Sequence, residues 1–199
     1  MTNNAQQSLT RLKTALHRSI GKSSLDFVRR AQKPVIICDR SGSMQWVDPG
    51  QELSRQALLN NHLAELAKSL EDFIVIAFND SAEITTLPIS NATGGTDMAG
   101  AIYLVASLRP SQVIIISDGS PNSTYDALEA RASLGTIRVD TIYVGDPLDT
   151  DAKDFMARLA TNGGQALTDG SSLLANSLAE KMLLMLTDGD SDSSESIAL

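Results

Sequence analysis

Three uninterrupted apolar runs constrain the fold of this chain more than any other feature. They cover residues 34–38, 73–78 and 113–117, and they consist mainly of Val, Ile, Ala and Phe. Apolar runs without alternation are typical of strands that are buried on both faces, which requires helices on both sides of their sheet. Helix-like segments lie between and after these runs, over 52–70, 97–108, 123–134, 150–160 and 171–186.

Three further segments complete the expected sheet. Residues 83–89 form a short strand that Pro88 weakens at its end, and 137–144 and 165–167 form two more. Strands that alternate with helices in this way form a mostly parallel sheet, because each parallel connection needs a crossover. The sequence therefore predicts a doubly wound α/β domain over 34–186.

The two flanks of this domain differ from it in composition. Residues 1–33 carry seven Lys or Arg against one acid, and four apolar residues at helical spacing predict a basic amphipathic helix over 7–22. Residues 187–199 alternate Asp and Glu with Gly and Ser, which is typical of a disordered acidic tail. The prediction is thus one central domain with a basic segment before it and an acidic segment after it.

Charge and cysteine content exclude several classes of function. Beyond residue 33 the chain has nine basic and 23 acidic residues, so we expect it to repel nucleic acid. No apolar run is long enough for a membrane span. The single cysteine, Cys38, can form no internal disulfide, which favours a reducing compartment and a cytoplasmic location.

Oxygen-bearing side chains follow two of the apolar runs and precede one helix. The first run ends in an acid and two hydroxyls at every second position, with Gly42 expected to let the loop turn tightly. A threonine follows two glycines before the helix at 97–108, and an aspartate directly follows the third run. In a doubly wound sheet these points lie at one edge. The candidate metal ligands are Asp39, Ser41, Ser43, Thr96 and Asp118.

Two carboxylates and three hydroxyls make a hard set of oxygen donors. Such a set selects Mg²⁺, Mn²⁺ or Ca²⁺ over Zn²⁺, which prefers His and Cys. The two carboxylates neutralise a divalent ion and the hydroxyls add no charge, so the ion keeps room for an anionic ligand. We therefore expect the metal to hold a carboxylate from a protein partner.

The pattern resembles a known family. Asp39-x-Ser41-x-Ser43, then Thr96 in Gly-Gly-Thr-Asp, then Asp118-Gly119 are similar to the metal-ion-dependent adhesion site of von Willebrand factor A domains. The resemblance covers roughly 34–186. It implies a Rossmann-like fold, a bound divalent cation, and a protein ligand docked through an acidic side chain. Intracellular members of the family accompany AAA+ ATPases or act as scaffolds, so an AAA+ ATPase or an assembly component is an expected partner.

Three other functions compete with metal-dependent adhesion. An aspartate after the first parallel strand also occurs in enzymes that form an aspartyl-phosphate, but those need a second acid where this chain has Ser41, so we expect no enzyme. A structural or assembly protein with a vestigial or merely stabilising metal site is the main alternative. The acidic tail at 187–199 could also occupy the metal of a neighbouring copy and produce a homo-oligomer.

Three residues near the expected site have other expected roles. Trp46 either folds back onto the domain or contacts the partner beside the metal. Asp97 is expected to cap the helix that it precedes, and Asp146 to shape a turn. Neither aspartate is included among the ligands.

Overall fold

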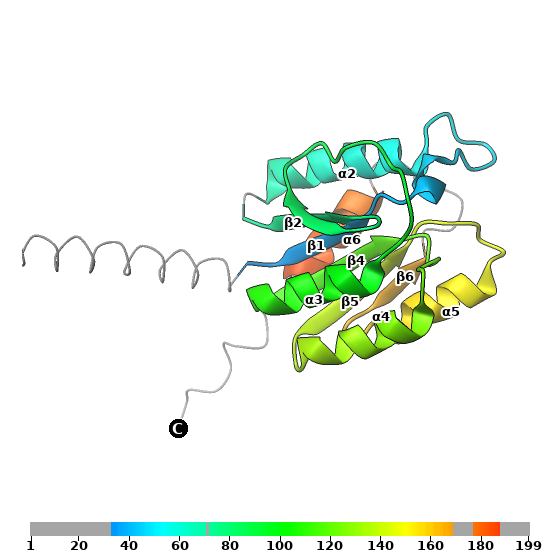
Figure 1. The fold of residues 1–199 in the computed structure, drawn as a ribbon. Helices are drawn as coiled ribbons and strands as arrows, with labels where there is room; N and C mark the ends of the chain where they lie inside the picture. The colour runs from blue at the N-terminus through cyan, green and yellow to red at the C-terminus, as the bar shows by residue number, and fades with distance from the viewer. Residues whose placement is uncertain (1–32, 71, 169–176, 188–199) are drawn as a thin grey trace, which may run out of the picture.

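The computed structural model describes residues 33–70, 72–168 and 177–187. The expected basic segment up to residue 32 and the acidic segment from residue 188 lie outside the described residues. The described part contains one six-stranded sheet with the order β3-β2-β1-β4-β5-β6 (Figure 1). The strands are β1 (Val35–Asp39), β2 (Ile74–Phe78), β3 (Ala82–Thr85), β4 (Gln112–Ser117), β5 (Arg138–Tyr143) and β6 (Ala166–Thr168).

The predicted doubly wound topology is confirmed. Strands β2, β1, β4, β5 and β6 run parallel, and only the edge strand β3 runs antiparallel. From β1 the chain moves outward through β2 to β3, and it then returns to the centre and moves outward the other way from β4. The neighbouring strands β1 and β4 therefore form the point where the strand order reverses, and ligands bind at this point in open α/β sheets.

Two helical layers cover the sheet because successive strand residues face opposite sides. In β1, Val35 and Ile37 belong to one core and Ile36 and Cys38 to the other, and all four are fully buried. The first core includes residues of α3, α4 and α5, and the second includes residues of α2 and α6 (Figure 1). These helices are α2 (Arg55–Ser69), α3 (Met98–Leu108), α4 (Thr124–Arg131), α5 (Thr150–Leu159) and α6 (Ser177–Thr187).

Several boundaries differ from the sequence prediction. The helix expected from residue 52 begins at Arg55, because Ser54 accepts a hydrogen bond from the backbone N–H of Ala57 and caps it. The strand expected over 83–89 ends at Thr85. The segment expected as one helix over 123–134 is α4 followed by a 3₁₀ turn, η2 (Ala132–Leu134).

The last helix continues to Thr187, one residue into the expected tail. The first residues of the predicted helix, 171–176, lie outside the described part. None of the described helices has the length and apolar character needed to cross a membrane.

A buried polar network holds α6 against the sheet. The Nε2 of Gln112 donates to Asp140 Oδ2 at 2.6 Å and to the carbonyl of Met185 in α6 at 2.7 Å. The other oxygen of Asp140 accepts from Arg138 Nη2 at 3.1 Å and from the backbone N–H of Gln165 at 2.8 Å. Asp140 is fully buried, so its charge depends on these donors.

Replacement of Asp140 by alanine should therefore lower the free energy of unfolding by about 2–4 kcal/mol, because it leaves buried donors without acceptors. Urea denaturation measures the loss. The matched control is Asp154→Ala on the exposed side of α5, which should change stability by less than about 0.5 kcal/mol. Equal effects of the two substitutions would contradict a structural role for the network.

Candidate metal centre

The expected ligands gather at the carboxyl edge of the sheet, where β1 and β4 diverge. Asp39 is the last residue of β1, and Asp118 directly follows β4. Ser41 and Ser43 lie at the start of a short 3₁₀ turn, η1 (Gly42–Gln45). Thr96 lies two residues before α3. Three separate loops thus bring the five residues to one edge.

The Asp39 carboxylate is completely buried and held by two bonds. Its Oδ1 accepts from the backbone N–H of Ser41 at 2.8 Å, and its Oδ2 accepts from Ser117 Oγ at 2.6 Å. The pKa of Asp39 is raised from 3.8 to about 6: burial and, to a smaller extent, the charge of Asp118 raise it, and the bonds from Ser117 and Ser41 offset part of the rise. The hydrogen bonds therefore fix the orientation of the Asp39 carboxylate, which is close enough to Asp118 for the two charges to repel each other.

The two serines present their hydroxyls to each other. Ser41 Oγ and Ser43 Oγ lie 3.2 Å apart, with Ser41 buried and Ser43 half-buried. The backbone N–H of Gly42 between them donates to the carbonyl of Gly94 at 3.1 Å. This bond ties the loop after β1 to the loop that carries Thr96.

Thr96 is bound to the third loop as well. Its backbone N–H donates to Asn122 Oδ1, and its carbonyl accepts from the backbone N–H of Asn122, both at 2.9 Å. Thr96 is only 6% exposed. Asn122 follows Asp118 by four positions, so this reciprocal pair connects the loop after β4 to the loop before α3. The sequence carried no signal that would have identified Asn122.

The glycine that the site requires is Gly94, and the expectation for Gly42 is wrong. Gly94 has φ +77°, a left-handed conformation that other residues rarely adopt. A Cβ at Gly94 would also lie 2.2 Å from Asp80 Oδ2, while Asp80 Oδ1 accepts from the backbone N–H of Gly95 at 2.9 Å. A Cβ at Gly42 would meet only the Gly94 carbonyl at an ordinary 3.5 Å.

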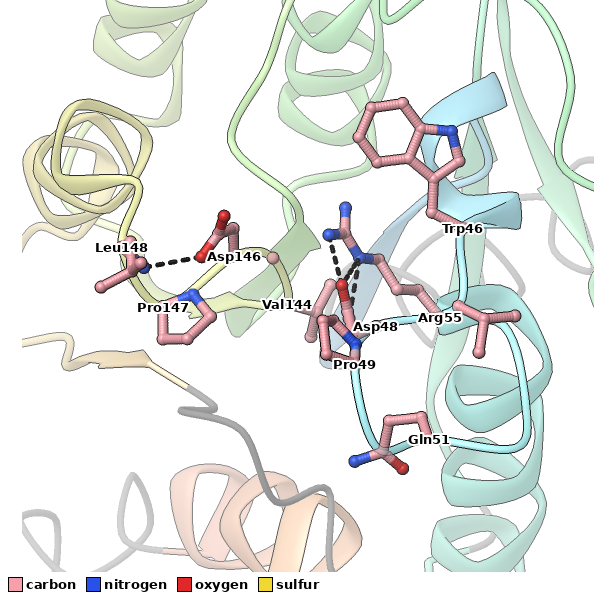
Figure 2. Close-up of a pocket in the computed structure, with 11 residues that line it drawn as sticks. Trp46, Asp48, Pro49, Gln51, Arg55, Val144, Asp146, Pro147 and Leu148 are labelled. Carbon is pink, nitrogen blue, oxygen red and sulfur yellow. Dashed lines mark hydrogen bonds and ion pairs between the residues drawn. The ribbon is translucent and has the colours of Figure 1, made fainter.

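Asp118 has a cationic neighbour that the sequence did not reveal. Arg55, at the start of α2, donates from Nη1 to Asp118 Oδ2 at 3.3 Å. Its Nε and Nη2 bind Asp48 at 3.0 and 2.7 Å, and its Cζ lies 5.7 Å from the centre of the Trp46 ring. Figure 2 shows Arg55 with Asp48 and Trp46 on one side of a pocket. Arg55 is only 6% exposed, and it lines this pocket.

The chemistry of these donors fits a hard divalent ion. The carboxylates of Asp39 and Asp118 interact electrostatically, the hydroxyls of Ser41 and Ser43 lie next to each other, and Mg²⁺, Mn²⁺ and Ca²⁺ prefer such oxygen ligands. Among the described residues, no three His, Cys, Asp or Glu side chains cluster in a way that could hold a metal ion, so any ion here would depend on the hydroxyls as well. That the five residues ligate a metal stays a prediction.

The neighbouring residues take the following positions. Asp97 caps α3 by accepting from the backbone N–H of Gly100 at 3.0 Å, and Asp146 accepts from the backbone N–H of Leu148 in a turn at 2.8 Å, as predicted for both. Trp46 is 65% exposed, so it is not folded back into the core of the domain, and its contact with a partner stays a prediction.

Comparison with known proteins shows the fold class. No protein-family model matches the chain, and no curated protein matches it either. Among solved structures, an aerotolerance-related membrane protein of Bacteroides fragilis is similar at 20% identity, covering 79% of this chain and 99% of its own, with a TM-score of 0.59. BatB of Bacteroides thetaiotaomicron is similar at 19% identity over 78% and 99% of the two chains, with a TM-score of 0.56.

A third similar structure is the manganese-loaded TRAP protein of Plasmodium vivax. It shares 17% identity over 80% of this chain and 74% of its own, with a TM-score of 0.53. The chain therefore has the von Willebrand factor A-like fold that its sequence motif suggested. At these identities the likeness shows the fold alone.

The raised pKa of Asp39 gives a stability effect with a definite sign. The folded protein without metal holds the Asp39 proton up to about pH 6, whereas the unfolded chain releases it near 3.8. The free energy of unfolding therefore falls as pH rises through this range. Because the amide of Asp39→Asn cannot ionise, the variant in chelator should be more stable than the original protein at pH 8, by on the order of 2 kcal/mol, and equal to it at pH 4.

Urea denaturation in chelator at the two pH values measures this difference. Saturating Mg²⁺ should then stabilise the original protein and leave Asp39→Asn almost unchanged, because the variant has lost one of the two charged donors. If the stability difference did not depend on pH, the burial of an ionised Asp39 would not be its cause.

Replacement of Gly94 by alanine should strain the loop that carries Thr96. A left-handed residue with a Cβ costs about 1–2 kcal/mol, and Asp80 must move away from the backbone N–H of Gly95. We expect lower thermal stability together with weaker Mg²⁺ binding by calorimetry. Gly42→Ala is the matched control and should change both much less; a larger effect at Gly42 would contradict the assignment.

Proposed function

We propose that this chain is a divalent-metal-dependent protein-binding domain that docks an acidic side chain of its partner on the metal. Asp39, Ser41, Ser43, Thr96 and Asp118 would hold the ion. The observation that carries the proposal is that hydrogen-bonded loops bring two buried carboxylates and three hydroxyl-bearing residues to the point where the strand order reverses. Ligands of open α/β sheets bind at such a point.

The charge of the donors supports an acidic partner. Asp39 and Asp118 together neutralise a divalent ion, and the remaining three ligands are neutral. The nearby Arg55 is balanced by its own partner, Asp48. An ion held in this way keeps its attraction for a carboxylate, which is a preferred ligand of Mg²⁺, Mn²⁺ and Ca²⁺. We propose Mg²⁺ as the ion, with Mn²⁺ or Ca²⁺ as substitutes; the manganese in the similar TRAP structure supports this class of ion.

A binding role accounts for the site better than catalysis does. An aspartyl-phosphate mechanism needs a general acid or base two residues after Asp39, where the chain has Ser41. Arg55 is a cation near the site, but two of its nitrogens are bound to Asp48 and a third donates to Asp118. A transferred phosphoryl group would find no unpaired cation among these contacts.

The resemblance suggests the kind of partner and the compartment. We propose an assembly component or an AAA+ ATPase as the partner, with self-association through the acidic residues after 187 as a further possibility to test. We also propose a reducing, cytoplasmic environment. Cys38 supports this, because it is the one cysteine of the chain and can form no internal disulfide.

The proposal is tested with the full chain as bait in Mg²⁺ and in chelator. Asp39→Ala should abolish Mg²⁺ binding by calorimetry and should release every partner that chelator releases, with the fold intact by circular dichroism. Asp126→Ala on the exposed side of α4 is the matched control and should keep both. Partners that remain bound in chelator and on Asp39→Ala would show that the metal does not mediate recognition.

A further inference from the structure

A hollow lies beside the candidate metal centre. It has a volume of about 640 Å³ and lies between the loop at 46–51 and the loop at 144–148, which face each other in Figure 2. Ligand-binding pockets in proteins commonly measure about 300–1,000 Å³, so the hollow is large enough for one or two bulky side chains. Its apolar lining comes from Trp46, Val47, Pro49, Val144, Pro147 and Leu148.

The rim of this hollow exposes large apolar side chains from both loops. Trp46 is 65% exposed and Val47 54% exposed on one side, and Leu148 is 85% exposed on the other. Of the remaining exposed large hydrophobic residues of the described part, Leu53 precedes α2, and the others lie on elements that do not line the hollow: Ile84 on β3, Tyr103 on α3, Tyr125 on α4 and Leu184 on α6. A concave apolar patch on two facing loops is typical of an interaction site, whereas single exposed residues are not.

One side chain joins the hollow to the metal centre. Arg55 lines the hollow, and its Nη1 lies 3.3 Å from Asp118 Oδ2. The guanidinium of Arg55 therefore borders both the hollow and the candidate metal centre. An extended peptide advances about 3.3–3.6 Å per residue, so a partner residue at the metal and another in the hollow would be within about three positions of each other.

The charges around the hollow decide which part of a partner can enter it. Arg55 is already paired with Asp48, and Asp146 adds a second carboxylate to the lining. The hollow thus offers an acidic residue one carboxylate not engaged by Arg55, that of Asp146, and no unpaired cation. A bulky uncharged side chain suits the hollow, and an acidic residue of the same segment suits the metal.

We propose that the hollow bounded by Trp46, Arg55 and Leu148 is the second half of the partner site and receives a large apolar side chain from the segment whose Asp or Glu lies on the metal. This inference rests on the proposed metal-dependent function and specifies its partner: an extended acidic segment with a Trp, Phe, Leu or Met within about three positions of the acid.

The test uses phage-displayed seven-residue peptides with Asp fixed at the centre and six random positions, selected on the full chain in Mg²⁺ and eluted with chelator. A matched library carries Asn at the centre. The expected result is recovery from the Asp library alone, with a large apolar residue enriched beside the Asp.

One enriched peptide is then titrated against three variants, in each of which one residue is replaced by Gln. Trp46→Gln and Leu148→Gln should each weaken binding about tenfold, as expected for an apolar anchor at a binding site. Tyr103→Gln, which replaces an exposed aromatic residue outside the hollow, should leave binding unchanged. Trp46 is the one tryptophan of the chain, so its emission should shift to the blue when the peptide covers it.

The outcomes separate this inference from the proposed function. Mg²⁺-dependent peptides that contain the acid without an apolar preference, or that bind the Trp46 and Leu148 variants normally, would overturn the second half of the site and leave metal-dependent binding in place. Equal recovery from the Asp and Asn libraries, or recovery that chelator does not reverse, would overturn both.

Discussion

The hydrogen bond from Ser117 Oγ to Asp39 Oδ2 joins the ends of the two central strands, and the arrangement of the site depends on it. A buried carboxylate is costly unless donors surround it, and the raised pKa of Asp39 shows that the compensation is only partial. The backbone N–H of Ser41 supplies the second donor, so the same carboxylate that bridges β1 and β4 also folds back the loop after β1. A metal ion would complete the compensation of this charge.

The other loops are attached to this anchor through backbone contacts. Gly42 binds the carbonyl of Gly94, and Thr96 exchanges two hydrogen bonds with Asn122. These bonds join residues of different loops, so the hydroxyl and carboxylate donors keep their mutual positions only while all three loops are folded. Such preorganisation would strengthen the binding of an ion, because little entropy is lost when the ligands are already ordered.

Arg55 connects the electrostatics of the centre to the surface beside it. The guanidinium divides its donors between Asp118 in the centre and Asp48 in the neighbouring loop, and it lies near the ring of Trp46. Binding of a divalent ion by Asp118 would weaken the attraction between Asp118 and Arg55. Arg55 therefore belongs to both the centre and the adjacent hollow, so a shift of its guanidinium caused by a ligand at one site would also alter the other site.

The sheet and the candidate donor residues could be predicted from the sequence, whereas the contacts that surround them became visible only in the folded structure. Apolar runs such as 34–38 and the spacing of Asp39, Ser41 and Ser43 are local patterns, and strand burial and loop chemistry follow from neighbours along the chain. The ion pair between Arg55 and Asp118 joins residues 63 positions apart, and nothing in the helix around Arg55 indicated it. The need for glycine at Gly94 rather than Gly42 likewise depends on a left-handed backbone packed against Asp80. Contacts of this kind depend on how loops that are distant in the sequence pack against each other, and local periodicity does not predict that packing.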